Sequence, residues 1–249
     1  MSFLFSDITI AYNNKDGLTR TLDSFFAQDF DDFEVIVVDG GSTDGSKELL
    51  EKYSDKFKNR GINFTYISEK DTGIYNAMNK GIKMSSGEWL LFMNSGDELC
   101  DSLVLHQASQ MISNQSADIV YGDYCRVYDN KKVYCVSSDK LKKIRKGLPF
   151  SHQSVFTKRE LFSPRPYDES LKISGDYEWF LNAYLEGKSF AHISLFVCDF
   201  YVDGISAYEK YAIYLEAEKI RISHEVADPR IVRMLKRIAW KLIDFAVKL

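Results

Sequence analysis

Residues 88–97 have the sequence EWLLFMNSGD. Its five apolar residues, 89–93, are followed at once by an amide, a hydroxyl, a glycine and a carboxylate. A short apolar run that ends in turn-forming residues predicts a strand buried on both faces. Ligands of an open α/β sheet bind beyond the carboxyl ends of its strands. The stretch therefore places Asp97 where a carboxylate can hold a divalent cation, although a polar turn after a core strand has the same pattern.

The composition is that of a globular protein with one large or two small domains. The chain has 249 residues, of which 45% are hydrophobic and 27% charged, and its net charge of −4 argues against a nucleic-acid partner. No secretory signal or transmembrane helix is expected. The cysteine spacing matches no zinc template, so we expect reduced thiols in a cytoplasmic protein. The cysteines are Cys100, Cys125, Cys135 and Cys198.

Strand and helix patterns alternate through the first hundred residues. Strands are expected at 8–12, 33–38, 63–67 and 88–93, and helices at 18–26, 46–58 and 74–84. This alternation predicts βαβ units, a mostly parallel sheet and right-handed crossovers.

The second half is less regular. A strand is expected at 118–121, ending at Gly122, then a hairpin at 126–136, a short strand at 155–156, a helix at 176–186 and a strand at 196–201. We expect an α/β fold whose sheet is flanked by helices and followed by a C-terminal amphipathic helix.

Three acids each follow a different predicted strand. Asp39, Asp71 and Asp97 are expected to meet at one edge of the sheet, where they repel one another unless a cation or a donor-rich ligand offsets the charge. Each also has a structural alternative, since aspartate is common in turns and at helix N-termini.

Four segments together resemble the family 2 glycosyltransferases, of the type that assembles bacterial surface polysaccharides. They are ITIAYN at 8–13, VVDGGSTDGS at 37–46, DTGIYNAMNKG at 71–81 and GEWLLFMNSGD at 87–97. The resemblance implies a GT-A fold and transfer of a sugar from a nucleotide diphosphate with inversion. It also implies a nucleotide-sugar half at 1–100, an acceptor half at 101–215 and a helical tail at 216–249.

The resemblance further implies a role for each matching residue. Asp39 contacts the nucleobase, usually uracil, because a carboxylate accepts a hydrogen bond from an imide N–H. Asp97 would bind Mg²⁺ or Mn²⁺, and His152 would contact the metal or the diphosphate; the alternative is that His152 is a satisfied structural residue. The other residues expected to line the nucleotide-sugar site are Ala11, Tyr12, Asn13, Asp71, Gly73, Asn79, Asn94, Ser95 and Gly96.

The metal motif departs from the family pattern. Many relatives carry three acids here, whereas Asn94 and Gly96 leave Asp97 as the single acid. One carboxylate plus diphosphate oxygens is enough for Mg²⁺, which keeps several waters.

Asp176 is the candidate catalytic base. Inverting transfer needs a group that takes the proton of the acceptor hydroxyl, and the segment around Asp176 resembles the family's late acidic motif, where an aspartate opens a helix. A helix N-terminus favours an ionised carboxylate. The structural alternative is that Asp176 only caps its helix.

A basic amphipathic helix is expected from 229 to 249. Its apolar face has Ile231, Leu235, Ile238, Leu242, Phe245 and Leu249, and its basic face has Arg230, Arg233, Arg237, Lys241 and Lys248. Such a helix can lie on the cytoplasmic face of an anionic inner membrane, or pack on the domain or on a second copy of the chain.

The sequence thus predicts transfer from a UDP-sugar to a glycan, carried on a lipid diphosphate, in O-antigen, capsule or exopolysaccharide synthesis. Two alternatives are a non-catalytic nucleotide- or glycan-binding protein with a reduced metal site, and a nucleotidyltransferase. The latter usually has a Gly-rich basic loop near its N-terminus, and residues 12–17 match that loop poorly.

Overall fold

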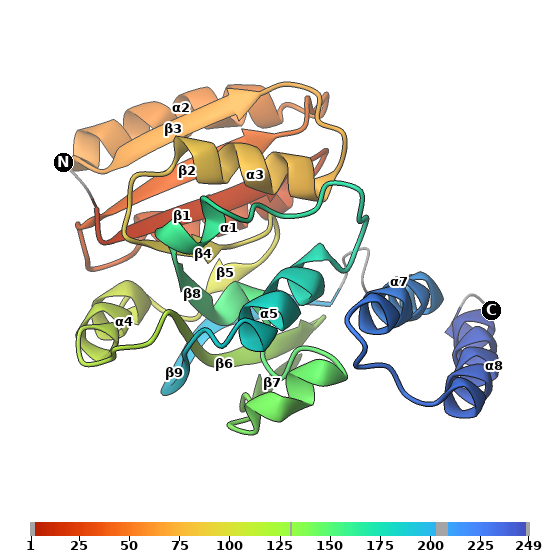
Figure 1. Ribbon diagram of the computed structural model, residues 1–249. Coiled ribbons are helices and arrows are strands. Elements are labelled where there is room, and N and C mark those ends of the chain that lie inside the picture. Colours follow the sequence, from red (N-terminus) through yellow and green to blue (C-terminus); the bar gives the residue numbers. More distant parts are fainter. Residues whose placement is uncertain (1–2, 130, 203–208, 248–249) are drawn as a thin grey trace.

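One mixed sheet, with helices on both faces, forms the centre of this computed structural model (Figure 1), and a hydrophobic core lies on each face of the sheet. The structure describes residues 3–129, 131–202 and 209–247. The first hundred residues alternate strand and helix as predicted. The elements are β1 (Phe5–Ala11), α1 (Lys15–Phe26), β2 (Phe33–Asp39), α2 (Ser46–Arg60), β3 (Asn63–Ser68), α3 (Ile74–Met84), β4 (Trp89–Phe92) and β5 (Glu98–Leu99).

The second half adds the strands that complete the sheet. Its elements are α4 (Val104–Ile112), β6 (Ile119–Tyr128), β7 (Lys131–Cys135), β8 (Val155–Lys158), α5 (Gly175–Leu185), β9 (Phe190–Tyr201), α7 (Lys210–Ser223) and α8 (Arg230–Val247). Three 3₁₀ turns join them: η1 (Leu141–Arg145), η2 (His152–Ser154) and η3 (Arg159–Phe162). The sequence pattern did not reveal α4 or α7, and the expected tail boundary at 215/216 falls inside α7.

The strand order is β3-β2-β1-β4-β8-β6-β9-β5, with β7 paired to β6. The first four strands are mutually parallel, and β8 then runs antiparallel to both β4 and β6. This arrangement confirms the predicted α/β class with a mixed central sheet. The register pairs Ala11 with Asp39 and Asp39 with Ser68, so β1, β2 and β3 end at the same level.

Alternating side chains of the strands supply the two cores. Phe5 and Val35 face one core together with Leu18 of α1 and Leu50 of α2, whereas Ile8 faces the other core with α3 and α5. All seven residues of β2 are buried, as expected of a central parallel strand. The helices therefore cover both faces of the sheet, and the loops at its carboxyl edge remain accessible.

The expected end of a strand at Gly122 is wrong. Strand β6 continues through it to Tyr128, with register irregularities against β9 around Asp123. A Cβ at Gly122 would lie 2.6 Å from the carbonyl oxygen of Leu195 in β9. The glycine therefore allows two strands to approach closely at an irregular pairing, a use of glycine that a sequence does not distinguish from a turn.

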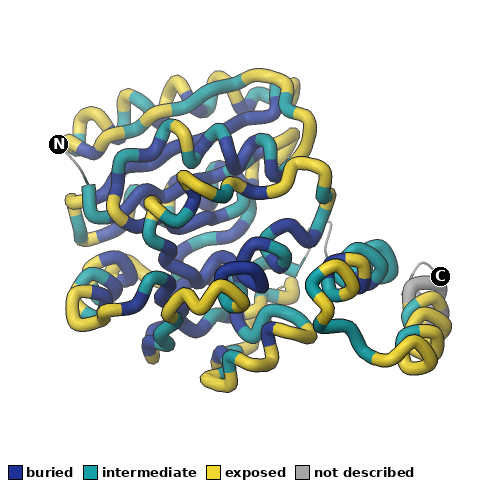
Figure 2. The backbone as a smooth tube through the Cα atoms, viewed as in Figure 1, coloured by how far each residue is buried: buried dark blue, intermediate teal, exposed yellow. Residues whose placement is uncertain are grey.

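Helix α8 projects from the domain and packs on α7 (Figure 1). Trp240 stacks on Tyr214, and Arg237 pairs with the buried carboxylate of Glu218. Much of the remaining helix surface is exposed (Figure 2). The side chains of Leu242 and Phe245, and residues 248–249, lie outside the description. In the described part of the chain, no helix is long and apolar enough to cross a membrane.

Asp7 is an unusual buried acid in the centre of β1. Its side chain is fully buried, and neither carboxylate oxygen has a hydrogen-bond partner. Burial, and secondarily the charge of Glu34, raises the pKa of Asp7 well above its ordinary value of 3.8. Between the unfolded and folded pKa values, the folded protein keeps a proton on Asp7 that the unfolded chain releases. The contribution of Asp7 to the free energy of unfolding is therefore complete below pH 3.8 and is lost as the pH rises towards the folded pKa.

We predict that Asp7→Asn increases the free energy of unfolding relative to wild type, and that the gain grows between pH 4.5 and 7.5. The amide does not titrate, so the slopes of the free energy of unfolding against pH differ between the two proteins by at most about 1.4 kcal/mol per pH unit. Urea unfolding at several pH values measures this difference. Parallel pH profiles for the two proteins would contradict the assignment.

Candidate functional site

The loops that follow β1 and β2 are hydrogen-bonded to one another. The N–H of Asn13 donates to Oγ of Ser42 at 2.7 Å, and the N–H of Thr43 donates to Oδ1 of Asn13 at 2.9 Å. Asn13 has a φ of 47°, a left-handed conformation that asparagine tolerates better than most residues. The adjacent Tyr12 is 67% exposed, so its ring offers a free surface beyond the buried end of β1 at Ala11.

Asp39 is the last residue of β2 and is fully buried. Its carboxylate accepts hydrogen bonds from the N–H of Ser42 at 3.1 Å, from Oγ of Ser68 at 2.6 Å and from Oγ of Ser42. These donors hold the acid at a fixed position beneath the loop. Three bonds to a group with about four lone-pair sites leave little capacity for a further donor.

Asp71 reaches the same place from the loop after β3. One oxygen accepts the N–H of Gly73 at 3.0 Å. A Cβ at Gly40 would lie 2.7 Å from the other oxygen and 3.2 Å from the ring of Tyr12. The absence of a side chain at Gly40 therefore lets Tyr12 and Asp71 converge beside the end of β2.

Asn79 faces a different segment. It is buried in α3 and donates to the carbonyl oxygen of Tyr167 and to the carboxylate of Glu169, both at 2.9 Å, and it accepts the N–H of Tyr167 at 2.9 Å. These three bonds fasten the segment before α5 onto α3. The structure thus gives Asn79 a positioning contact, away from the loops that carry Tyr12 and Asp39.

The segment 94–97 is bound to the start of α1. Nδ2 of Asn14 donates to the carbonyl oxygen of Ser95 at 2.9 Å, and Oγ of Ser95 donates back to the carbonyl oxygen of Asn14 at 3.2 Å. Gly96 has a φ of 114°, a conformation open to glycine, and its N–H donates to Oγ1 of Thr21 at 3.0 Å. The loop is therefore rigid, and it lies beside the loop after β1.

Asp97 faces the second half of the chain. It is 5% exposed; Oδ2 accepts Nε2 of Gln153 at 3.0 Å, and Oδ1 accepts the N–H of Tyr201 at 2.9 Å. These two bonds fix the position of a carboxylate, which is the type of oxygen ligand that Mg²⁺ and Mn²⁺ favour.

The three loop acids do not share one centre. Among the residues described, the one group of three histidine, cysteine or acidic ligands within 4.8 Å of one another lies elsewhere. Asp39, Asp71 and Asp97 therefore do not form one compact group of ligand atoms, although each follows a strand of the same parallel set. Asp39 and Asp71 stand near Tyr12, whereas Asp97 faces β9 and η2.

Asp176 lies in the first turn of α5, and Ser174 is the N-cap residue. Asp176 therefore does not cap the helix, which removes the structural alternative considered for it. The hydroxyl of Tyr75 donates to Oδ1 of Asp176 at 3.4 Å, and Nδ1 of His152 lies 4.0 Å from Oδ2. The side chain of Asp176 is 23% exposed, which leaves it accessible to a ligand.

His152 packs among aromatic rings beside Asp176. It is 7% exposed, and its Nε2 lies 3.2 Å from the hydroxyl of Tyr167. Burial lowers the pKa of His152, and the charge of Asp176 opposes this effect. Burial and Asp176 both raise the pKa of Tyr75 and of Tyr167. The carboxylate of Asp176 thus faces neutral partners.

Turn η2 connects the two acids. His152 approaches Asp176, and the next residue, Gln153, donates to Asp97. Gln153 was not among the predicted site residues, because a lone glutamine carries no motif signal.

Glu216 is a second residue that the sequence did not reveal. From α7, its carboxylate accepts the backbone N–H groups of Lys172, Ile173 and Ser174 at 2.9, 2.8 and 2.7 Å. These residues immediately precede α5, so Glu216 holds the backbone that leads into Asp176. No local sequence pattern predicts a contact between residues more than forty positions apart.

Comparisons with known proteins identify a family for the chain. The family model described as Glycosyl transferase family 2 matches residues 6–164. A PGL/p-HBAD biosynthesis glycosyltransferase of Mycobacterium bovis is 30% identical over 178 residues, which cover 71% of this chain and 68% of the relative.

Solved structures share the fold. Staphylococcus aureus TarS 1–349 in complex with UDP-GlcNAc has a TM-score of 0.70 at 22% identity and covers 96% of this chain and 70% of its own. The mannosyltransferase PcManGT of Pyrobaculum calidifontis, in complex with GDP-Man and Mn²⁺, has a TM-score of 0.71 at 16% identity and covers 97% and 69%. Another TarS structure has a longer chain, of which this chain spans 42%.

We predict that Glu216→Ala loosens the backbone before Asp176. Loss of a carboxylate that accepts three N–H groups should lower the free energy of unfolding by about 1–3 kcal/mol. Hydrogen exchange of the amides of 172–174 should accelerate, while Glu51→Ala, a change of an exposed glutamate on α2, should leave it unchanged. Unaltered protection of 172–174 in the Glu216 variant would contradict this role.

Proposed function

The chain belongs to glycosyl transferase family 2, and we propose that it transfers a sugar from a UDP-sugar to a hydroxyl of a glycan, with inversion at the anomeric carbon. The observation that carries the proposal is the position of Asp176. Its accessible carboxylate begins α5 and contacts Tyr75, which begins α3 directly after the loop of Asp71 and Gly73. A candidate base thus adjoins the loops expected to bind the donor.

The donor would lie over the ends of β1, β2 and β3. Tyr12 offers its exposed ring to the base or ribose, and Asp39 and Asp71 supply acceptors at the same edge. UDP-GlcNAc is the ligand of one structural neighbour, which supports a uridine nucleotide here. Ala11, Asn13 and Gly73 shape the pocket through their backbone, and the rigid segment 94–96 would adjoin the diphosphate.

The chemical step assigned to this chain is proton removal. Asp176 takes the proton of the acceptor hydroxyl while the oxygen of that hydroxyl bonds to the anomeric carbon. The bond from that carbon to the diphosphate oxygen breaks, and UDP leaves with the electron pair.

Asp97 would hold a divalent cation, Mg²⁺ or Mn²⁺, with diphosphate oxygens and water completing its shell. The chemistry of Asp97 suits a cation of this kind, because it is a carboxylate held in place by Gln153 and by the N–H of Tyr201, and hard divalent cations prefer oxygen ligands. When bound, the cation neutralises charge on the leaving diphosphate. His152 faces Tyr167 and Asp176, so we assign it to the surroundings of the base.

We predict that Asp176→Asn lowers the rate of transfer 10²–10⁴-fold, the usual contribution of a general base. UDP release in the presence of acceptor measures the rate, and calorimetry measures UDP binding, which should change by less than about twofold because the base acts on the acceptor. The control, Asp55→Asn on the exposed face of α2, should retain activity. A fully active Asp176 variant would refute the base assignment, and a non-catalytic binding protein would show no transfer in either variant.

The acceptor is proposed to be a glycan on a lipid diphosphate, used in surface-polysaccharide assembly at the cytoplasmic face of a membrane. Helix α8 supports this proposal, because several of its described apolar side chains are exposed instead of packed. The exposed fractions are 71% for Ile231, 58% for Met234 and Leu235, and 55% for Ile238. Basic residues line the same helix, as in helices that lie in an anionic interface.

We predict that the full chain co-sediments with anionic liposomes and that a chain ending at Asp228 does not. Binding should weaken with salt, since basic side chains contribute to it. A full-length variant with Leu235→Asp, which keeps α7 and the helix register, should also lose binding. Equal sedimentation of the wild type and these variants would refute the membrane role and favour contact of α8 with a second copy.

A further inference from the structure

Two thiols and one carboxylate gather outside the proposed catalytic site. Sγ of Cys100, Sγ of Cys125 and a carboxylate oxygen of Asp199 all lie within 4.8 Å of one another. We call these residues the thiol cluster. Cys125 and Asp199 are buried, and Cys100 is half-buried.

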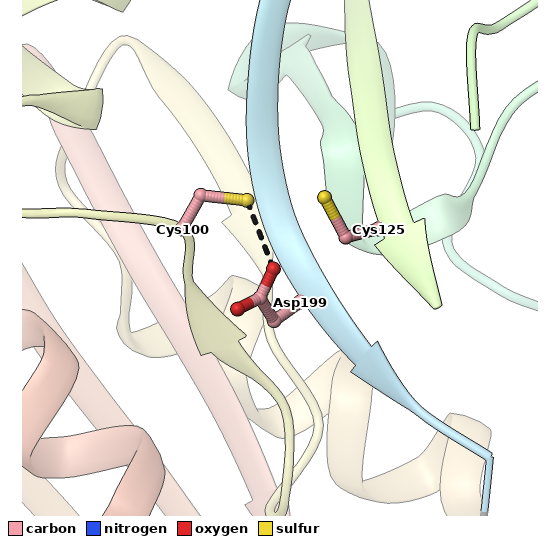
Figure 3. A group of neighbouring side chains, drawn as sticks. All are labelled: Cys100, Cys125 and Asp199. Carbon is pink, nitrogen blue, oxygen red and sulfur yellow. Dashed lines mark hydrogen bonds between the residues drawn. The ribbon is translucent and has the colours of Figure 1, made fainter. Parts of the chain in front are cut away.

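Three neighbouring strands bring the thiol cluster together. Asp199 is in β9 and pairs with Cys125 in β6, and Cys100 directly follows β5, with its N–H bonded to the carbonyl oxygen of Val197 at 3.1 Å. Figure 3 shows the two sulfur atoms facing one another across β9, with Asp199 beside them. The pairing of the sheet, and not the spacing in the sequence, creates the cluster.

A disulfide does not suit this arrangement. Strand β9 lies between β5 and β6, and adjacent strands are about 4.8 Å apart, so the two cysteine backbones are separated by about 10 Å. A disulfide requires Cα atoms within about 7 Å. A metal ion bound between the two sulfur atoms does not require the Cα atoms to be so close.

The surrounding charges suit a divalent cation. Sγ of Cys100 donates to Oδ1 of Asp199 at 3.2 Å, and Nζ of Lys132 pairs with Oδ2 at 2.6 Å. Replacing the two thiol protons by one M²⁺ gives a net charge of −1 for cation, two thiolates and carboxylate, and Lys132 brings the total to zero.

We propose that the thiol cluster binds one thiophilic divalent cation of the Zn²⁺ class, with Cys100, Cys125 and Asp199 as ligands and water in a fourth position. Tetrahedral bonds of about 2.3 Å place two sulfur ligands about 3.8 Å apart, and the three candidate ligand atoms lie within 4.8 Å of one another. The cation would tie β5, β9 and β6 together. Its site is distinct from the oxygen-rich surroundings of Asp97, and the proposal does not depend on the proposed function.

The test is a titration of the reduced full chain with Cd²⁺, followed by the ultraviolet thiolate-to-metal charge-transfer band. We expect the band to saturate at one equivalent, to be lost in Cys100→Ser and Cys125→Ser, and to persist in excess Mg²⁺. Zn²⁺ should displace Cd²⁺ and raise the Tm of the wild type but not of Cys100→Ser.

Cys135→Ser is the matched control. Cys135 is also half-buried and lies in the adjoining strand β7, but it pairs with Tyr124, whose side chain is on the opposite face from that of Cys125. Because Cys100 is half-buried, Cys100→Ser should fold, and circular dichroism checks this. A band that is absent from the wild type, that survives in Cys100→Ser, or that is equally lost in Cys135→Ser would overturn the proposal.

Discussion

The common end level of β1, β2 and β3 is the constraint on which the candidate site depends. Because the parallel register aligns Ala11, Asp39 and Ser68, three loops leave the sheet at one edge. Their approach is close enough that Gly40 has no room for a side chain between Tyr12 and Asp71. The buried carboxylate of Asp39 then fixes its own loop through serine donors. The position of the candidate site is thus a consequence of strand pairing, and the polar residues of the three loops supply its hydrogen-bonding groups.

The second half of the chain is joined to this edge by buried polar contacts. Asp97 accepts a side-chain bond from Gln153 and a backbone bond from Tyr201, although it belongs to the loop after β4. A buried acid bonded to two distant segments fixes their relative positions, because losing either partner exposes an unsatisfied charge to a low-dielectric interior. Since His152 adjoins Gln153, the same turn also sets the surroundings of Asp176.

The sequence predicted what depends on local pattern. The apolar runs and helix periodicity of the first hundred residues gave every long element there, and the bounds of α3 matched. It mispredicted the end of β6, because Gly122 serves strand packing instead of a turn. It did not predict which segments Asp39, Asp71 and Asp97 face, since the direction of a side chain after a strand depends on its distant partners. Gln153 and Glu216 act through contacts across the fold, and nothing in their neighbouring residues distinguishes them.

The edge formed by β1, β2 and β3 and the surroundings of Asp176 are assembled in different ways. The edge proposed to bind the donor is built from consecutive βαβ units, so motifs in sequence order describe it well. The surroundings of Asp176 come from α3, η2 and α7, which are distant in sequence. Because Glu216 links α7 to the backbone before Asp176, and α8 packs on α7, the exposed apolar helix is mechanically connected to the candidate base. An acceptor held at a membrane would therefore approach the side of the domain whose geometry the C-terminal helices set.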